Sequence, residues 1–345
     1  MTSTLNPTVR SLPETSNPSR KEPRWQALRR LPDGPLDLVG DIHGEIGALT
    51  DLMGRLGYSE RGDHPEGRRL VFLGDLIDRG TDSAAVVRKV RDLTERGRAC
   101  AVMGNHDLNA VAGAQRDNNG WLFGHKRMRP GERAAEEHER ADVLGFLATL
   151  PLAMERDDLR VVHAYWDDEG LARLSDEDGP AEALHRYAAK VKEALGDEPD
   201  PVVRGLAKQN ANPMKRITSG PEVAAAAPHF AGGQLRHEQR DPWWERYDGE
   251  HWVVFGHYWR LPVSGIQQDD GLLSKHPLNA ALGNGRAMCI DYSVGGRWWD
   301  RSEGRWSGPF LGRLAALRWP EKELVFDDGE RMPVVNPDGT VSREE

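Results

Sequence analysis

Short apolar runs recur along the chain from residue 36 onward, and a polar, turn-forming cluster follows nearly every one. The runs are rich in Val, Leu and Ile and are mostly continuous rather than alternating, which is typical of central strands covered on both faces. They lie at 36–39 (LDLV), 69–73 (RLVFL), 100–103 (CAVM), 159–164 (LRVVHA), 251–256 (HWVVFG) and 287–293 (AMCIDYS). The pattern therefore predicts six largely buried strands.

Two segments between the first three runs have a helical pattern. Residues 45–57 and 81–97 carry apolar side chains at three- and four-residue spacing, and each has a glycine near its end. Alternation of strands with helices predicts an α/β core. Residues 165–245 break this rhythm, because they are charged and only in part helical in pattern, as at 180–196. We expect this segment to be a partly helical insertion lying over the core.

The pattern also suggests where the domain begins and ends. Residues 1–24 are rich in Ser, Thr, Pro and Asn and have little to bury, which predicts a disordered N-terminal arm. We expect one domain at 25–320, interrupted by the insertion at 165–245. The sequence ELVFDDGERMPVV at 323–335 predicts a hairpin with its turn at DDG, so 321–345 is expected to be a C-terminal hairpin and tail.

Composition narrows the classes of partner. The 345 residues carry a formal net charge of −9 and no basic stripe, which disfavours binding to a nucleic-acid backbone. No apolar stretch approaches the roughly 20 residues that span a bilayer, and the N-terminus has no apolar signal segment, so we expect no membrane association and a cytoplasmic location. The oligomeric state is left open.

Chemically distinctive residues accompany five of the apolar runs. GDIHG follows the first run, GDLIDRG the second and GNHD the third, while the fourth contains a histidine and the fifth leads into GH. The carboxyl ends of strands in an open α/β sheet are where sites assemble. We therefore expect one site that contains Asp41, His43, Asp75, Asn105, His106, His163 and His257.

These residue types suit a pair of metal ions. Side chains two apart on an extended backbone point the same way, so Asp41 and His43 can hold one ion together. Carboxylate, imidazole and amide oxygen ligands suit Mn, Fe, Zn or Co. Two ions sharing a carboxylate would use six of the seven residues and leave one histidine for chemistry. Taken alone, Asp41 is more readily explained as a helix cap, Asn105 as another cap and His163 as a core residue, but the recurrence at five strand ends favours metal binding.

In order and spacing, GDIHG…GDLIDRG…GNHD…VVHA…GH resembles the calcineurin-like metallophosphoesterases over roughly residues 36–300. The unbroken GDLIDRG at 74–80 is similar to the phosphoprotein phosphatase branch, which includes serine/threonine phosphatases and bacterial diadenosine tetraphosphate hydrolases. The resemblance implies an α/β fold in which two mixed β-sheets pack as a sandwich flanked by helical layers.

The resemblance also implies a role for each residue of the motifs. Asp41, His43 and Asp75 would hold one ion, and Asp75 would bridge to a second. The second ion would be completed by Asn105, His163 and His257. The cofactors would be two divalent metal ions, with Mn favoured and Fe, Zn or Co as alternatives.

Other motif residues would act on the substrate. His106 would be the general acid, Asp78 would orient it, and Arg79 would hold the substrate phosphate. Protein phosphatases of this branch use a second phosphate-binding arginine, for which Arg204 in VVRG and Arg260 in GHYWR are the candidates. The sequence VHAYWDDEG departs from the HGG or HAG found at this histidine in the well-known branch members.

Three functions are compatible with these features. The leading one is a phosphomonoesterase of protein serine/threonine phosphatase type, acting on a phosphoprotein. The alternative is hydrolysis of a dinucleoside polyphosphate, such as diadenosine tetraphosphate, or of another small phosphoester or nucleotide. The tryptophans that cluster at 243–306 favour this alternative, because they could form a surface on which bases stack, although packing is their default role. A non-catalytic scaffold of the same fold is the third, and the complete set of ligands weighs against it.

Overall fold

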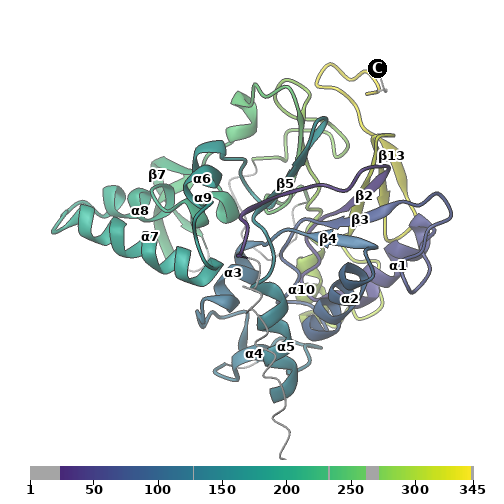
Figure 1. Cartoon of the computed structure of the whole chain (residues 1–345), viewed down its shortest axis with the longest axis horizontal. Helices are drawn as coiled ribbons and strands as arrows, with labels where there is room; N and C mark the ends of the chain where they lie inside the picture. The colour runs from purple at the N-terminus through teal and green to yellow at the C-terminus, as the bar shows by residue number, and fades with distance from the viewer. Residues whose placement is uncertain (1–23, 127, 232–233, 262–271, 343–345) are drawn as a thin grey trace, which may run out of the picture.

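Two large β-sheets, a small two-stranded sheet, ten α-helices and two 3₁₀ helices make up the part of the protein that a computed structural model describes, residues 24–126, 128–231, 234–261 and 272–342 (Figure 1). The N-terminal arm expected at 1–24 lies outside the described residues, apart from Arg24. A separate two-stranded ribbon stands in the segment expected to be an insertion.

The first sheet has five strands in the order β1-β5-β6-β9-β10. The pair β5 and β6 is antiparallel and the other neighbours are parallel, so the sheet is mixed. Its strands are β1 (Leu28–Arg30), β5 (Ala153–Arg156), β6 (Leu159–Val162), β9 (Trp252–Phe255) and β10 (Ala287–Cys289).

The second sheet has six strands in the order β13-β12-β11-β2-β3-β4. Parallel pairs join β2, β3 and β4, and antiparallel pairs join the remaining strands. The segment after residue 320 therefore completes this sheet. Its strands are β2 (Leu36–Val39), β3 (Arg69–Phe72), β4 (Ala99–Ala101), β11 (Ala315–Trp319), β12 (Glu323–Phe326) and β13 (Arg331–Pro333).

The two sheets pack face to face. Alternate residues of the strands, such as Leu38 and Val71 in one sheet and Val161 and Val254 in the other, form one buried cluster between them. Their neighbours along the strands belong to a second cluster that includes the helices. Because successive strand residues point to opposite faces, continuous apolar runs are what this double burial requires. The predicted α/β sandwich of mixed sheets is confirmed.

Helices cover the outer faces. Helix α2 (Ser83–Glu95) begins where the Asp82 side chain accepts a hydrogen bond from the backbone of Ala85, and it buries an apolar stripe. Helix α1 (Ile46–Leu56) ends at Gly57, whose φ of 96° favours glycine. The other helices near these sheets are α3 (Asn105–Val111), α4 (Gly120–Phe123), α5 (Glu137–Leu147), the short 3₁₀ helix η2 (Val294–Gly296) and α10 (Arg297–Ser302).

The segment between β6 and β9 lies on the side of the molecule away from α1 and α2 (Figure 1). It contains α6 (Asp168–Arg173), α7 (Pro180–Leu195), α8 (Pro201–Asn210) and α9 (Pro213–Ser219), then the antiparallel strands β7 (Glu222–Ala231) and β8 (Gln234–Arg240), and the 3₁₀ helix η1 (Trp243–Arg246). The sequence pattern did not predict this hairpin.

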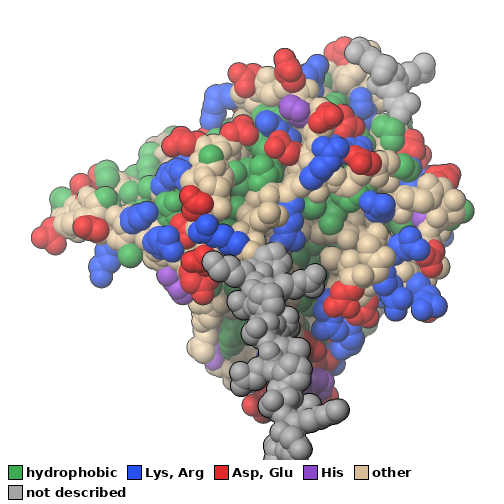
Figure 2. All heavy atoms as spheres, in the orientation of Figure 1, with side chains coloured by type: hydrophobic (Ala, Val, Ile, Leu, Met, Phe, Trp, Pro, Cys, Tyr) green, Lys and Arg blue, Asp and Glu red, His purple; other side chains and the backbone are tan. Residues whose placement is uncertain are grey.

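The surface mixes charges of both signs. Figure 2 shows Lys and Arg side chains interspersed with Asp and Glu over the face in view. None of the helices in the described residues is long and apolar enough to cross a membrane.

Candidate active site

Asp41 and His43 follow β2 in a turn that requires small residues. A Cβ at Gly40 would lie 2.2 Å from the carbonyl oxygen of Ile290. The ring of His43 is fixed by Nδ1, which lies 3.1 Å from the carbonyl oxygen of Ile77. Its Nε2 therefore faces the Asp41 carboxylate, at 3.9 Å.

Asp75 occupies the centre of the cluster, just after β3. Its Oδ1 accepts a 2.9 Å hydrogen bond from the backbone N–H of His106 and lies 3.4 Å from Nε2 of His163. Its Oδ2 lies 3.6 Å from Nε2 of His43. Because the two oxygens face different histidines, this carboxylate is placed to be shared between two ions.

Asn105, His163 and His257 converge from three elements on the other side of Asp75. The Oδ1 atom of Asn105 lies 3.2 Å from Nε2 of His163 and 2.9 Å from Nδ1 of His257. The backbone N–H of His257 faces Asp41, 3.2 Å from Oδ2. The Nε2 atom of His257 is buried and has no hydrogen-bond partner among the described residues. A buried ring nitrogen without a partner is costly unless something else binds it.

Two groups of side chains, both buried, each bring their candidate ligand atoms within 4.8 Å of one another. One is His43, Asp75 and His106, and the other is Asp75, His163 and His257. Asp75 belongs to both. The structure thus places the seven residues singled out from the strand ends in one cluster, and it puts His106 as close to the first group as a ligand would be.

Carboxylates crowd together at Asp41. Burial and the neighbouring Asp291 raise the pKa of Asp41 well above its usual value. Burial likewise raises the pKa of Asp291 to about 6, although the Ser293 backbone N–H acts to lower it. Bringing negative groups together in a buried place is unfavourable unless positive charge is present.

The histidines of the cluster experience opposite effects. Burial, together with Arg79, lowers the pKa of His43 well below its usual value. Burial and Arg240 do the same to the pKa of His257. Burial also acts to lower the pKa of His163, but Asp75 and Asp41 outweigh it and raise that pKa to about 10.

This donor set fits divalent metal ions. It combines carboxylates that repel one another, imidazole nitrogens and one amide oxygen, the mixture that borderline transition metals prefer. Cations would neutralise the buried carboxylates, and one of them could bind the Nε2 atom of His257, which has no hydrogen-bond partner among the described residues. The residues present therefore suit two ions that share Asp75.

His106 is linked to Asp78 and Arg79 on the first side of the cluster. Its Nδ1 lies 2.6 Å from Oδ2 of Asp78, whose other oxygen accepts a 2.7 Å hydrogen bond from Trp121. The Nη1 atom of Arg79 lies 2.8 Å from Nε2 of His43, and its Nη2 lies 3.1 Å from Nε2 of His106. The guanidinium of Arg79 is therefore directed into the cluster.

The two other arginines considered from the sequence lie elsewhere. Arg260 is buried, and its nitrogens donate to the carbonyl oxygens of Cys289, Pro277 and Ala280 at 2.7, 2.9 and 2.6 Å. Arg204, on α8, donates to backbone oxygens near residue 198. The whole guanidinium of Arg260 and one nitrogen of Arg204 are thus engaged by backbone oxygens.

Sequence reasoning missed three residues near the cluster. Asp107 accepts hydrogen bonds from the backbone N–H groups of Leu76 and Gly104 at 3.1 and 2.9 Å, and so joins two site loops. The Asn118 amide lies 3.0 Å from Nδ1 of His106. Asp291 could have been predicted from the sequence, because it too follows a buried strand. No feature of the sequence around Asn118 indicates a place in the site.

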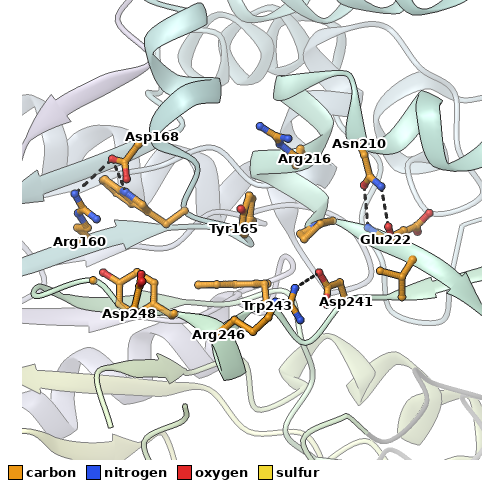
Figure 3. Close-up of a pocket in the computed structure, with 15 residues that line it drawn as sticks. Arg160, Tyr165, Asp168, Asn210, Arg216, Glu222, Asp241, Trp243, Arg246 and Asp248 are labelled. Carbon is orange, nitrogen blue, oxygen red and sulfur yellow. Dashed lines mark hydrogen bonds and ion pairs between the residues drawn. The ribbon is translucent and has the colours of Figure 1, made fainter. Parts of the chain in front are cut away.

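A separate cavity of about 570 Å³ lies among β6, α8, α9 and η1 (Figure 3). Each arginine that lines it is paired with a carboxylate. Arg160 lies 3.4 Å from Asp168, Arg216 donates to Asp167 at 2.7 Å, and Arg246 pairs with Asp241. None of the residues predicted for the site is among those that line it.

Comparison with known proteins identifies the family. The family model of the calcineurin-like phosphoesterases matches residues 34–261, which span every residue of the cluster except Asp291. The chain belongs to the calcineurin-like phosphoesterase family. The resemblance inferred from the motifs is confirmed, and with it the expectation of a hydrolase acting on phosphate ester bonds. The family implies a dinuclear divalent metal site, which the cluster fits.

Named relatives are tetraphosphatases. The symmetrical bis(5'-nucleosyl)-tetraphosphatase of Pectobacterium carotovorum is 27% identical over 67% of this chain and 84% of its own length. The asymmetrical bis(5'-nucleosyl)-tetraphosphatase PrpE of a Geobacillus strain is 27% identical over 64% of this chain and 78% of its own. That of Halalkalibacterium halodurans is 47% identical, but over only 20% of this chain and 30% of its own length.

Solved structures also match over most of the chain. The cold-active protein-tyrosine phosphatase of a Shewanella species is 17% identical, covers 94% of this chain and 87% of its own, and has a TM-score of 0.48. A serine/threonine phosphatase from Saccharomyces cerevisiae is 15% identical, covers 77% and 81%, and has a TM-score of 0.42.

Proposed function

We propose that this phosphoesterase hydrolyses dinucleoside polyphosphates or related nucleotides, using two divalent metal ions. The observation that carries the proposal is the buried cluster around Asp75, beside Arg79 and His106, in a chain whose longer-matching relatives are named as bis(5'-nucleosyl)-tetraphosphatases. These names favour the alternative drawn from the sequence over the serine/threonine phosphatase that the sequence favoured.

The proposed ligands divide between the two sheets. Asp41, His43 and Asp75 would hold one ion, and Asp75 with Asn105, His163 and His257 would hold the other. The ions would act as Lewis acids, which make water a nucleophile near neutral pH and neutralise phosphate oxygens. The identity of the metals is part of the proposal, with Mn favoured and Fe, Zn or Co as alternatives.

The remaining residues act on the substrate directly. Arg79 donates from two nitrogens in a planar fork, the arrangement that matches two oxygens of a phosphate. When substrate is bound, its phosphate would take over these donors from His43 and His106.

His106 would then be free to protonate the oxygen of the leaving group from Nε2. Asp78 accepts from the opposite nitrogen, Nδ1, so its carboxylate fixes the orientation of the ring and stabilises the protonated imidazole. General acid catalysis matters most for leaving groups that are poor without a proton.

Product analysis tests the proposal. The purified protein, supplied with Mn²⁺, is incubated separately with diadenosine tetraphosphate and with a phosphoserine peptide, and nucleotides and phosphate are separated by ion exchange. We expect a kcat/KM at least tenfold higher for the dinucleotide. Release of two molecules of ADP would indicate symmetrical cleavage, and AMP with ATP would indicate asymmetrical cleavage. A higher kcat/KM for the phosphopeptide would overturn the proposal and restore the protein phosphatase.

A further inference from the structure

A second arginine, Arg129, stands beside Arg79 on a turn fixed to the active-site loop. The backbone N–H of Arg133, at the end of this turn, donates to Thr81 at 2.9 Å, and the Arg133 side chain bonds Asp82 at 2.7 Å. Within the turn, the backbone N–H of Arg129 donates to the Glu132 carboxylate at 2.9 Å. Arg129 is thereby held at a set position relative to the loop that carries Arg79.

Arg301 adds a second link between the turn and the loop. Its side chain reaches the carbonyl oxygen of Arg79 at 3.3 Å and that of Pro130 at 3.4 Å. Its charge is balanced by the buried carboxylate of Glu45, with which it forms two hydrogen bonds. Arg301 therefore braces the two segments and is not itself available to a ligand.

The guanidinium of Arg129 is incompletely satisfied. Its Nη1 is buried and has no hydrogen-bond partner among the described residues. Burial and the nearby charge of Arg79 lower the pKa of Arg129 to about 10. Glu132, Asp78 and Asp117 act in the other direction. One oxygen of Glu132 accepts from the backbone N–H of Arg129, and its Oε1 has no hydrogen-bond partner among the described residues. An anion that binds between the two arginines would accept a hydrogen bond from the unpaired donor. It would also reduce the repulsion between the two positive charges.

Each of the two arginines lies over a tryptophan. The Cζ atom of Arg79 is 5.0 Å from the ring centroid of Trp259, and that of Arg129 is 4.3 Å from the ring centroid of Trp298, on α10. Stacking holds a guanidinium plane in place and leaves its edge, with the N–H donors, free for a phosphate. Each guanidinium therefore lies against an aromatic face, and Arg129 adds a second positive charge near Arg79.

Charge distinguishes this place from the cavity of Figure 3. There Arg160, Arg216 and Arg246 each face a carboxylate, so their charges are already balanced. Two further lining carboxylates, Glu222 and Asp248, add negative charge. A polyphosphate would be repelled from that cavity and attracted to Arg79 and Arg129.

We propose that Arg129 binds the second phosphate of a polyphosphate chain whose first phosphate is held by Arg79 at the metal cluster. This inference rests on the proposed function and refines it, because it makes linked phosphates the group that the site selects. A monoester has no second phosphate for Arg129 to bind. Arg129 would therefore favour polyphosphates over simple esters.

Inhibition by inorganic phosphates tests the role of Arg129 without requiring the natural substrate. Hydrolysis of p-nitrophenyl phosphate by the manganese-loaded protein is inhibited separately with orthophosphate and with tripolyphosphate. We expect the preference for tripolyphosphate, given by the ratio of the two inhibition constants, to fall about tenfold in Arg129→Gln, the size of a lost charge-assisted hydrogen bond. Calorimetric titration with tripolyphosphate gives the same comparison without turnover.

Two further variants make the test specific. Arg246→Gln removes one arginine from the cavity of Figure 3 and should keep the wild-type ratio. Arg129→Lys keeps the positive charge but loses the planar fork, so it should give a ratio between those of the wild type and Arg129→Gln. This second substitution at position 129 keeps the test valid if the glutamine variant misfolds. Metal content and thermal unfolding are measured for each. An unchanged ratio in a folded, metal-loaded Arg129→Gln, or an equal fall in Arg246→Gln, would overturn the inference.

The result is separable from that of the proposed function. Should the wild-type protein fail to cleave diadenosine tetraphosphate while the ratio still falls in Arg129→Gln, polyphosphate binding by Arg129 stands and the proposed substrate is wrong. If the dinucleotide is cleaved and the ratio does not change, the proposed function stands and Arg129 has no part in it.

Discussion

Asp78 holds His106 through a contact of 2.6 Å between Oδ2 and Nδ1, and Trp121 holds Asp78 in turn through a 2.7 Å hydrogen bond to Oδ1. The two oxygens of one buried carboxylate thus have separate tasks. One orients the imidazole, and the other anchors the carboxylate to the element that carries Trp121, which is α4.

Replacement of Asp78 by Asn should slow the chemical step. The amide cannot stabilise a protonated imidazole as a carboxylate does, so we expect kcat to fall by about 10²-fold or more for esters with poor leaving groups and less for good ones. A series of aryl phosphates measures this dependence. Trp121→Phe serves as the control, because it removes the anchor but leaves the carboxylate, and it should lower kcat less. Equal kcat values for Asp78→Asn and wild type with the poorest leaving group would contradict the assignment.

Replacement of Asp75 by Asn should remove bound metal as well as activity. Asp75 faces histidines of both groups, and an amide offers one neutral oxygen where a carboxylate offers two charged ones. We expect the metal content, measured by mass spectrometry, to fall from two ions towards one or none. Asp92→Asn, on the surface of α2, should retain both ions. A variant at position 75 that keeps two ions and full turnover would exclude a shared carboxylate.

Removal of metal should destabilise the fold. Without cations, Asp41 is buried beside Asp291, and burial together with Asp291 raises the pKa of Asp41 well above its usual value. A ligand that binds only the folded state stabilises it by about 2.7 kcal/mol at a free concentration 100 times its Kd. Thermal unfolding after chelation, and after addition of Mn²⁺, Fe²⁺, Zn²⁺ or Co²⁺, measures the effect. Ca²⁺, which prefers oxygen ligands, should give a smaller rise, and an equal rise with Ca²⁺ would argue against histidine ligands.

Acid should weaken the contact between α5 and the start of α2. Hydrogen bonds from Arg133 lower the pKa of Glu139 to about 2. Because the unfolded chain takes up this proton near pH 4.3, the contribution of Glu139 is complete above that pH and is lost as the pH falls towards 2. Arg133→Gln should therefore lower the urea midpoint most at pH 6, and the difference from wild type should narrow by pH 3.5. A difference that stays constant with pH would show that Arg133 acts through packing alone.

A methyl group at Gly80 should disrupt the site loop. A Cβ there would lie 2.2 Å from the carbonyl oxygen of His43, which is backbone and cannot move aside cheaply. We expect Gly80→Ala to lower the free energy of unfolding by about 1–3 kcal/mol or more. Gly54, in the exposed interior of α1, has open space around it, and Gly54→Ala should raise that free energy by about 0.5–1 kcal/mol. Chemical denaturation compares the two, and equal effects would contradict the close contact.

The parts of the fold that sequence predicted are those whose residues are buried on both sides. All four residues of β2 are buried, and this run was visible as LDLV. Strand β1 reads LRR, is three residues long and is partly exposed, so its register comes from pairing with β5 rather than from its own pattern. The sequence pattern also failed to predict the hairpin of β7 and β8, because the first strand contains four consecutive alanines, and alanine does not favour strands.

The candidate site shows the same division. Asp41, His43, Asp75, Asn105, His163 and His257 were predictable because each stands at or just beyond a strand end, where topology alone brings residues together. Arg129 was not predictable, because its position depends on contacts that Arg133 and Arg301 make with loops distant in the chain. Sequence spacing contains no record of such contacts.

The location of His163 and His257 just beyond two neighbouring parallel strands has a consequence for how this enzyme could change. The whole stretch from α6 to η1 leaves the core beside one proposed ligand and returns beside the other, so its length and fold could vary while the ends of β6 and β9 stay paired. Exchange of that stretch alone could alter which molecules reach the proposed metal site without changing the residues that form it. This architecture would let substrate preference change independently of bond cleavage.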